Sequence, residues 1–277
     1  MPTFTEKLQA KWDEGKFVCV DLDSDIAKLP SHILAKYYDS ADAQLDFNRQ
    51  IIDATKDIVC AYKPNLAFYR GDLGKKTLKK TIRYIREKTS SMVIILDAKQ
   101  ADIGNTNDGY VTEDFEYYGA DAVTVHPYLG MEAMKPFLDR SDKGVIVLCV
   151  TSNPGSEEFQ DLMVDGEPLY QRVAGNVSSN WNYNGNCALV VGATYPDELE
   201  EVREIVGDMP ILIPGIGAQG GDLEKTVLAG RDSKNQGMIV NSSRGIIFAS
   251  SGEDFAEVAR REAQKLHEAI TATLAAA

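Results

Sequence analysis

Eight short apolar segments recur along the chain, and a stretch with helical spacing follows each of them. The apolar segments cover residues 17–22, 58–62, 92–96, 122–125, 145–150, 188–191, 211–213 and 238–240. The helical stretches cover residues 41–56, 75–87, 107–118, 131–138, 169–180, 197–206, 223–229 and 254–274. This alternation is typical of repeated βα units with a parallel sheet. Because eight parallel strands favour closure, we expect an α/β protein with a TIM (β/α)8 barrel.

The length of the chain fits one such barrel. A barrel of about 250 residues would use most of the 277 residues, and no Gly/Ser-rich linker divides them, so we expect one domain over residues 1–277. Before the first strand, Phe4, Leu8 and Trp12 are spaced by four and predict an extra N-terminal helix. The long connection at residues 152–168 is either a binding loop or lid, or a plain surface excursion.

The charge balance limits the partners of the protein. A formal net charge of -13 and a pI near 4.7 argue against nucleic acid or a membrane surface, although local cations could still bind a small anion. The N-terminal residues lack an apolar signal core and no stretch approaches the roughly 20 apolar residues that span a bilayer, so we expect a soluble cytoplasmic protein. Four cysteines without metal-ligand spacing are expected as reduced core residues, although a disulfide between adjacent strands stays open: Cys19, Cys60, Cys149 and Cys187.

The third apolar segment ends in an acid, a base and a second acid. Residues 92–96 are continuously apolar, as in a central parallel strand, and Asp97 and Lys99 follow. Side chains two positions apart on a strand point the same way, so these two should share a direction. Asp102 lies in the next connection, where a loop can fold its carboxylate back beside the ammonium. Taken alone, the pattern also fits an ordinary surface ion pair.

The loops after the seventh and eighth strands predict a phosphate site. Residues 214–221 read Pro-Gly-Ile-Gly-Ala-Gln-Gly-Gly, which lets backbone N–H groups turn inward without obstruction by Cβ atoms. Such a loop alone is often only a turn. Arg244 in the adjacent unit can add a guanidinium, and phosphate commonly binds at these two loops of a barrel.

These motifs together resemble one enzyme family. Asp97-x-Lys99-x-x-Asp102-Ile103, Lys63 after the second strand, the Pro-Gly-Ile-Gly-Ala-Gln loop and the late Arg244 are similar to orotidine 5′-phosphate decarboxylases, in particular the longer bacterial-type branch. The resemblance spans nearly the whole barrel. It implies conversion of orotidine 5′-monophosphate to UMP and carbon dioxide, the last step of UMP biosynthesis, without a cofactor or a metal.

The resemblance also assigns roles to the charged residues. Lys99 would donate a proton to C6 of the base, and Asp97 would face the leaving carboxylate. Lys63 and Asp23 would contact ribose hydroxyls and the charge network. Asp23 is preferred to Asp21 because it closes the first strand at the expected place, but the sequence leaves that choice open.

The remaining roles concern the substrate and a second subunit. Asp102, Ile103 and Thr106 would reach into the neighbouring subunit's site, which implies a homodimer with two shared sites. The other residues expected to bind substrate are Ser152 at the pyrimidine, Pro214, Gln219 and Arg244 at or beside the phosphate, and Ser243, where a backbone role is expected.

Two alternatives compete with this interpretation. Related barrels decarboxylate 3-keto-gulonate 6-phosphate or condense formaldehyde with a sugar phosphate, but they bind magnesium with an acidic group at the end of strand two, where this chain has Lys63. A noncatalytic barrel that binds a phosphate ligand is the other alternative. Outside these motifs, Asp114 and Glu116 are expected to face solvent on a helix.

Overall fold

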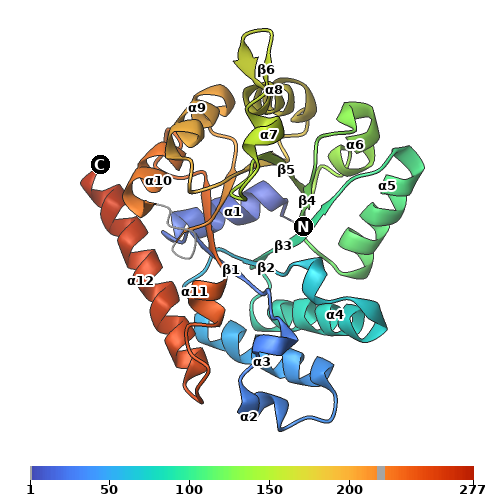
Figure 1. Ribbon diagram of the computed structural model, residues 1–277, viewed down its shortest axis with the longest axis vertical. Coiled ribbons are helices and arrows are strands. Elements are labelled where there is room, and N and C mark those ends of the chain that lie inside the picture. The colour runs from blue at the N-terminus through green and yellow to red at the C-terminus, as the bar shows by residue number, and fades with distance from the viewer. Residues whose placement is uncertain (1, 217–221) are drawn as a thin grey trace.

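The computed structural model describes residues 2–216 and 222–277, and eight parallel strands form a closed barrel in it (Figure 1). Around the barrel the strands are β1 (Val18–Asp21), β2 (Ala61–Lys63), β3 (Val93–Gln100), β4 (Ala122–Val125), β5 (Gly144–Val150), β8 (Cys187–Val191), β9 (Ile211–Pro214) and β10 (Met238–Ser242). β1 pairs with both β2 and β10, which closes the sheet. The expected TIM barrel is therefore confirmed.

Helices surround the barrel, as Figure 1 shows. The longer ones are α1 (Phe4–Asp13), α3 (Ser40–Thr55), α4 (Gly71–Lys88), α5 (Gly104–Val111), α6 (Gly130–Leu138), α8 (Leu169–Asn176), α9 (Pro196–Val206), α10 (Leu223–Gly230) and α12 (Phe255–Ala276). Shorter turns are η1 (Ile26–Lys28), α2 (Ser31–Leu34), η2 (Leu66–Phe68), α7 (Glu157–Gln160) and α11 (Arg244–Ile247). Two expected helices end in π-helical turns, η3 (Thr112–Tyr117) and η4 (Val177–Trp181). Among the described helices, none is long and apolar enough to cross a bilayer.

The strand interiors explain why these segments form a barrel. The apolar run of β3 is completely shielded from solvent, because the barrel interior covers one face and the helices cover the other. The four cysteines lie buried in or beside strands as free thiols, which confirms the expectation of reduced core residues. β3 continues to Gln100, four residues beyond the predicted end, and its pairing with β4 shifts register between Leu96 and Gln100.

The N-terminal helix α1 covers the end of the barrel where the strands begin. Phe4 packs so closely on Gly144, the first residue of β5, that a Cβ atom there would lie 2.5 Å from the Phe4 ring. The Trp12 indole Nε1 donates to the carbonyl of Met238, the first residue of β10, at 2.8 Å. Lys7 pairs with the buried Asp121, which precedes β4, at 2.7 Å. The predicted extra helix is confirmed, and it leaves the opposite end of the strands for a site.

The connection at residues 152–168 contains structure of its own. It holds α7 and a two-stranded hairpin of β6 (Met163–Val164) and β7 (Glu167–Pro168). Figure 1 shows the hairpin projecting from the rim of the molecule, away from the barrel axis. Its first residues lie at the barrel mouth, whereas the hairpin forms a surface excursion.

Asp114 is buried, although the sequence predicted that it faces solvent. It lies in η3 and is 1% exposed, and its carboxylate accepts a hydrogen bond from the Gln100 side chain. Burial, with a smaller contribution from Glu113, raises the pKa of Asp114 to about 7. Glu116 does face solvent, as expected. The wider turn of a π-helix rotates residues away from the face that regular helical spacing predicts, and this turn brings Asp114 inward.

Asp114 should make stability depend on pH. Because its native pKa lies above the unfolded value, the native state holds a proton that the unfolded chain releases, and stability is lost as pH rises from about 4 through about 7. Asp114→Asn should match the wild type near pH 4 and exceed its unfolding free energy by about 4 kcal/mol near pH 8. Urea unfolding at both pH values measures the difference. Glu116→Gln is the exposed control, and an equal offset at both pH values for Asp114→Asn would contradict the explanation.

Candidate active site

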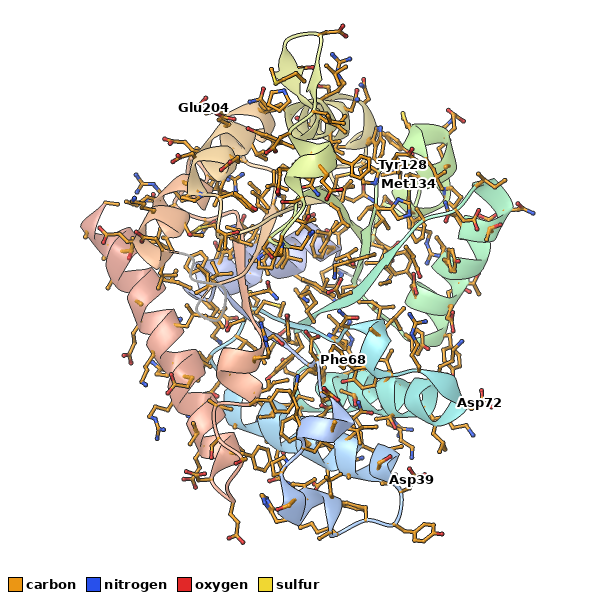
Figure 2. The ribbon with its side chains drawn as sticks, in the orientation of Figure 1. Asp39, Phe68, Asp72, Tyr128, Met134 and Glu204 are labelled. Carbon is orange, nitrogen blue, oxygen red and sulfur yellow. The ribbon has the colours of Figure 1, made fainter. Side chains whose placement is uncertain are left out.

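A cavity of about 700 Å3 opens at the C-terminal ends of the barrel strands. Most of the predicted site residues line it: Asp23, Lys63, Asp97, Lys99, Ser152, Pro214, Ser243 and Arg244. Gln219 lies outside the described residues. Phe68 of η2, labelled in Figure 2, adds an apolar wall after β2. The closed barrel thus gathers side chains that are distant in the sequence.

The end of β3 brings Asp97 and Lys99 into contact. The Lys99 ammonium Nζ donates to both carboxylate oxygens of Asp97 at 2.6 Å. Lys99 has a φ of 47° and its N–H donates to the Thr124 hydroxyl at 3.0 Å, so regular strand alternation does not produce the contact. A left-handed conformation costs a non-glycine residue roughly 1–2 kcal/mol, so the surrounding structure must hold Lys99 in place.

Lys63 lies between two carboxylates at the end of β2. Its Nζ is 3.1 Å from Asp21 Oδ1 and 3.0 Å from Asp97 Oδ2, and the residue is only 4% exposed. Burial alone would lower the pKa of Lys63, but Asp21, Asp97 and Asp23 together raise it well above its usual value. Lys63 is therefore a fixed positive charge inside the cavity.

Asp97 receives hydrogen bonds from several sides. Besides the two lysines, the Thr124 hydroxyl donates to Oδ1 at 2.8 Å and the Asn65 side chain donates to Oδ2 at 3.3 Å. Burial would raise the pKa of Asp97, but the ammonium groups of Lys63 and Lys99 hold it well below its usual value. Asp97 is thus a permanently ionised carboxylate whose orientation is fixed by four donors.

The two acids of the β1 segment differ in their surroundings. Asp21 accepts a hydrogen bond from the Asn241 side chain at 2.5 Å and forms an ion pair with Lys63, and burial raises its pKa to about 7 despite the nearby lysine. Asp23 accepts from the Ser243 hydroxyl at 3.1 Å, and burial also raises its pKa. Asp23 Oδ1 is buried without a hydrogen-bond partner among the described residues, which leaves it available to a ligand.

The opposite wall of the cavity can take an anion. Gly215 follows β9 with a φ of 106°, a conformation that favours glycine, and it lines the cavity beside Pro214. Arg244 begins α11 after β10, is exposed at the cavity, and forms no ion pair with a described residue. A guanidinium free to form two parallel hydrogen bonds suits a phosphate.

Three predicted residues do not line this cavity. Asp102 does not fold back onto Lys99, because its Oδ1 accepts instead from the Ile103 N–H at 2.7 Å. Asn107 holds the connection in this shape, since its side chain contacts the Asp102 backbone and the carbonyl of Ala133. Ile103 is 62% exposed and Thr106 is exposed as well. The expectation that the Asp102 carboxylate lies beside the ammonium of its own chain is therefore wrong.

Reasoning from the sequence missed some residues at the site. Thr124 is the one hydroxyl in the apolar β4 and contacts both Asp97 and Lys99, and that polar interruption was a usable signal. Gln160 of α7 lines the cavity and bonds the Thr151 N–H at 2.9 Å, a contact that no local motif predicts. Among residues 2–216 and 222–277, no group of three or more His, Cys, Asp or Glu side chains has the arrangement of a metal site.

In chemical terms, Asp21, Lys63, Asp97 and Lys99 alternate in charge at the base of one cavity, and the carboxylate of Asp23 lines the same cavity. The ammonium of Lys99 is half exposed toward the open space, whereas Lys63 and Asp97 beneath it are buried. Fixed charges of this kind can stabilise negative charge that develops on a bound ligand, because they need not reorganise as the charge moves.

Comparison with known proteins places this geometry in a family. The chain matches the Orotidine 5′-phosphate decarboxylase / HUMPS family over residues 18–260. It is 52% identical over 274 residues to the orotidine 5′-phosphate decarboxylase of Janthinobacterium sp. (strain Marseille), covering 99% of this chain and 100% of that protein. The Leishmania donovani OMP decarboxylase structure has a TM-score of 0.85 at 35% identity, covering 99% of this chain and 100% of its own. The Leishmania donovani UMP synthase structure has a TM-score of 0.87 at 36% identity, and the match covers 99% of this chain and 57% of that one. The chain belongs to the orotidine 5′-phosphate decarboxylase / HUMPS family.

Proposed function

We propose that this protein decarboxylates orotidine 5′-monophosphate to UMP and carbon dioxide, with Lys99 as the proton donor and without a cofactor. The observation that carries the proposal is the contact of Lys99 with both oxygens of Asp97, above the buried Lys63, at the base of a cavity that Arg244 also lines. The name of the Janthinobacterium relative agrees with this reaction.

The chemistry explains why such charges are needed. Loss of carbon dioxide from C6 leaves a carbanion whose lone pair is not conjugated with the ring, so the ring offers no ordinary electron sink. An ammonium held beside C6 stabilises that charge and then supplies the proton. Because Asp97 and Lys63 fix the surroundings of Lys99 before substrate binds, little reorganisation is needed during the reaction.

Repulsion between Asp97 and the substrate carboxylate is a smaller contribution. Two unit charges about 4 Å apart at an effective dielectric of about 20 interact by roughly 4 kcal/mol. Demanding enzymes lower barriers by up to roughly 20 kcal/mol, so stabilisation of the transition state must supply most of the effect.

The cavity walls suggest how the nucleotide lies. We place the phosphate at Pro214, Ser243 and Arg244, together with Gln219, and the pyrimidine near Ser152. The ribose hydroxyls then face Lys63 and the free oxygen of Asp23, which favours Asp23 over Asp21 as the ribose ligand. Binding energy from the remote phosphate can help to organise the charges at C6.

Lys63 is the feature that favours this reaction over the sugar-phosphate alternatives. Those barrels use an acidic group at the end of the second strand to bind magnesium, whereas here an ammonium occupies the space between Asp21 and Asp97. A cation already bridges the carboxylates, and it would repel a second one. We further propose that residues 1–277 act as one domain and that the enzyme is cytoplasmic, as its free thiols suggest.

Decay of the orotidine absorbance band on mixing with the wild-type protein tests the reaction directly. Turnover should be unchanged by a chelator, and Lys99→Ala should lower kcat by about 10⁴-fold or more, since it removes both the proton and the positive charge at C6. The variant should still fold and bind UMP. Lys28→Ala removes a lysine from the cavity rim without touching Asp97 and serves as the matched control. Near-normal turnover by Lys99→Ala would exclude the proton-donor role, and an intact absorbance band with wild type would leave only a binding function.

We also propose a homodimer in which Asp102, Ile103 and Thr106 complete the partner's site. These residues lie after β3 but do not line their own chain's cavity. Exposed apolar side chains accompany them: Ile103 at 62% and, after β4, Tyr128 at 89%, which Figure 2 labels. Exposed apolar surface of this kind marks contacts between proteins.

Mixing two inactive variants tests the shared site. Lys99→Ala and Asp102→Ala homodimers should each be inactive, but a mixed dimer should regain one intact site, because one of its sites contains neither substitution. Up to about a quarter of wild-type activity per total site is expected after complete random exchange of subunits. Activity that stays absent although subunit exchange is seen by mass spectrometry would contradict the shared-site arrangement.

A further inference from the structure

Asp21 is a third carboxylate in the cavity, and the proposed chemistry gives it no role. It is the last residue of β1, is 5% exposed and lines the cavity. A single oxygen, Oδ1, forms an ion pair with Lys63 Nζ at 3.1 Å and accepts a hydrogen bond from Asn241 Nδ2 at 2.5 Å. Asp21 therefore touches the one buried lysine that also contacts Asp97.

The surroundings of Asp21 combine charges of both signs. The groups around it are Cys19 and Asp23 of its own segment, Lys63 of β2, Asp97 and Lys99 of β3 across the cavity, Arg244 after β10, and the uncharged Asn241 of β10. Counting the three acids and two lysines, this cluster carries a net charge of one negative unit when Asp21 is ionised and no net charge when it is protonated. Protonation of Asp21 therefore removes one negative charge from the lower part of the cavity.

We propose that Asp21 is a positioning residue that holds the Lys63 ammonium against Asp97, and that its carboxylate takes up a proton when an anionic nucleotide binds. The inference rests on the proposed function, since it concerns the same cavity. The proton comes from solvent and adds to the carboxylate, and it returns to solvent when the ligand leaves. No covalent bond to the ligand forms or breaks in this step.

The burial of Asp21 makes proton uptake possible near neutral pH. Burial raises its pKa to about 7, Lys63 and Asn241 oppose that rise, and Asp23 and Asp97 add to it. An entering nucleotide brings more negative charge and so favours the protonated form further. Asp21 should therefore have little effect on anion binding below about pH 7, where it is protonated, and should oppose anion binding as pH rises above that value.

Asp21→Asn is the central test, because it keeps an oxygen for Lys63 and removes the charge. We expect UMP to bind about tenfold more tightly to Asp21→Asn than to wild type near pH 8.5, and equally tightly near pH 6. Taking the ratio of the two dissociation constants at each pH cancels the titration of UMP itself. Asp21→Ala removes the oxygen as well as the charge, so we expect it to lower kcat for orotidine 5′-monophosphate about tenfold, because a small displacement of Lys63 disturbs the charges at C6. A ratio that does not change with pH would overturn the proposal.

Two further variants separate the positioning of Lys63 from the charge of Asp21. Asp25→Asn removes a charge from the rim of the same cavity without contacting Lys63, and it should leave kcat within about twofold of wild type. Asn241→Ala removes a donor that favours the ionised form of Asp21, so it should move the pH transition of UMP binding to higher pH. This second measurement needs no substitution of Asp21, and a transition that does not move would also overturn the proposal.

The assays distinguish failure of this inference from failure of the proposed function. Wild-type protein that decarboxylates orotidine 5′-monophosphate but shows a constant binding ratio would exclude the role of Asp21 alone. Wild-type protein that leaves the substrate intact, yet binds UMP with the expected pH dependence, would exclude the decarboxylase function and retain Asp21 as the proton-uptake site.

Discussion

The buried ammonium of Lys63 is the interaction on which the rest of the site depends. The charge of this lysine is compensated by Asp21 and Asp97, which lie 3.1 and 3.0 Å from it, and by the nearby Asp23. Removing one partner of such a group leaves an uncompensated buried charge, which typically costs about 3–5 kcal/mol. The barrel supplies the framework, since Asp21 and Lys63 are the last residues of β1 and β2 and Asp97 lies in β3, three strands that are neighbours in the closed sheet.

The same charges orient the more exposed Lys99. Asp97 is fixed from below by Lys63 and from the side by Thr124, so it presents both oxygens to Lys99 in one direction. The left-handed backbone at Lys99 is held by the bond of its N–H to Thr124. Strained backbone at a functional site persists where the surrounding structure determines it, and here β4 provides that support.

Local sequence patterns predicted those features that depend on local geometry. The apolar runs predicted each barrel strand, and the acid and base that end β3 do lie at the mouth of the barrel. Gln160 could not be assigned, because its contact with Thr151 arises from loop folding rather than from spacing. Thr124 was visible as the hydroxyl in an apolar strand, but its partner Asp97 follows from strand order and not from spacing. Asp114 was placed on the wrong face because a π-helical turn breaks the regular period. For Asp102, the hydrogen bonds of Asn107 decide the shape of the connection, and no charge pattern reveals them.

The helix α1 has a consequence for the order of events at the site. Phe4 and Trp12 pack against the first residues of β5 and β10, so the floor of the barrel is closed by apolar side chains. Substrate and products would then enter and leave through one opening, at the mouth lined by the strand ends. In the proposed reaction, carbon dioxide and UMP leave through that same opening. Carbon dioxide, which would form beside Asp97, then has to diffuse past the nucleotide or leave after it.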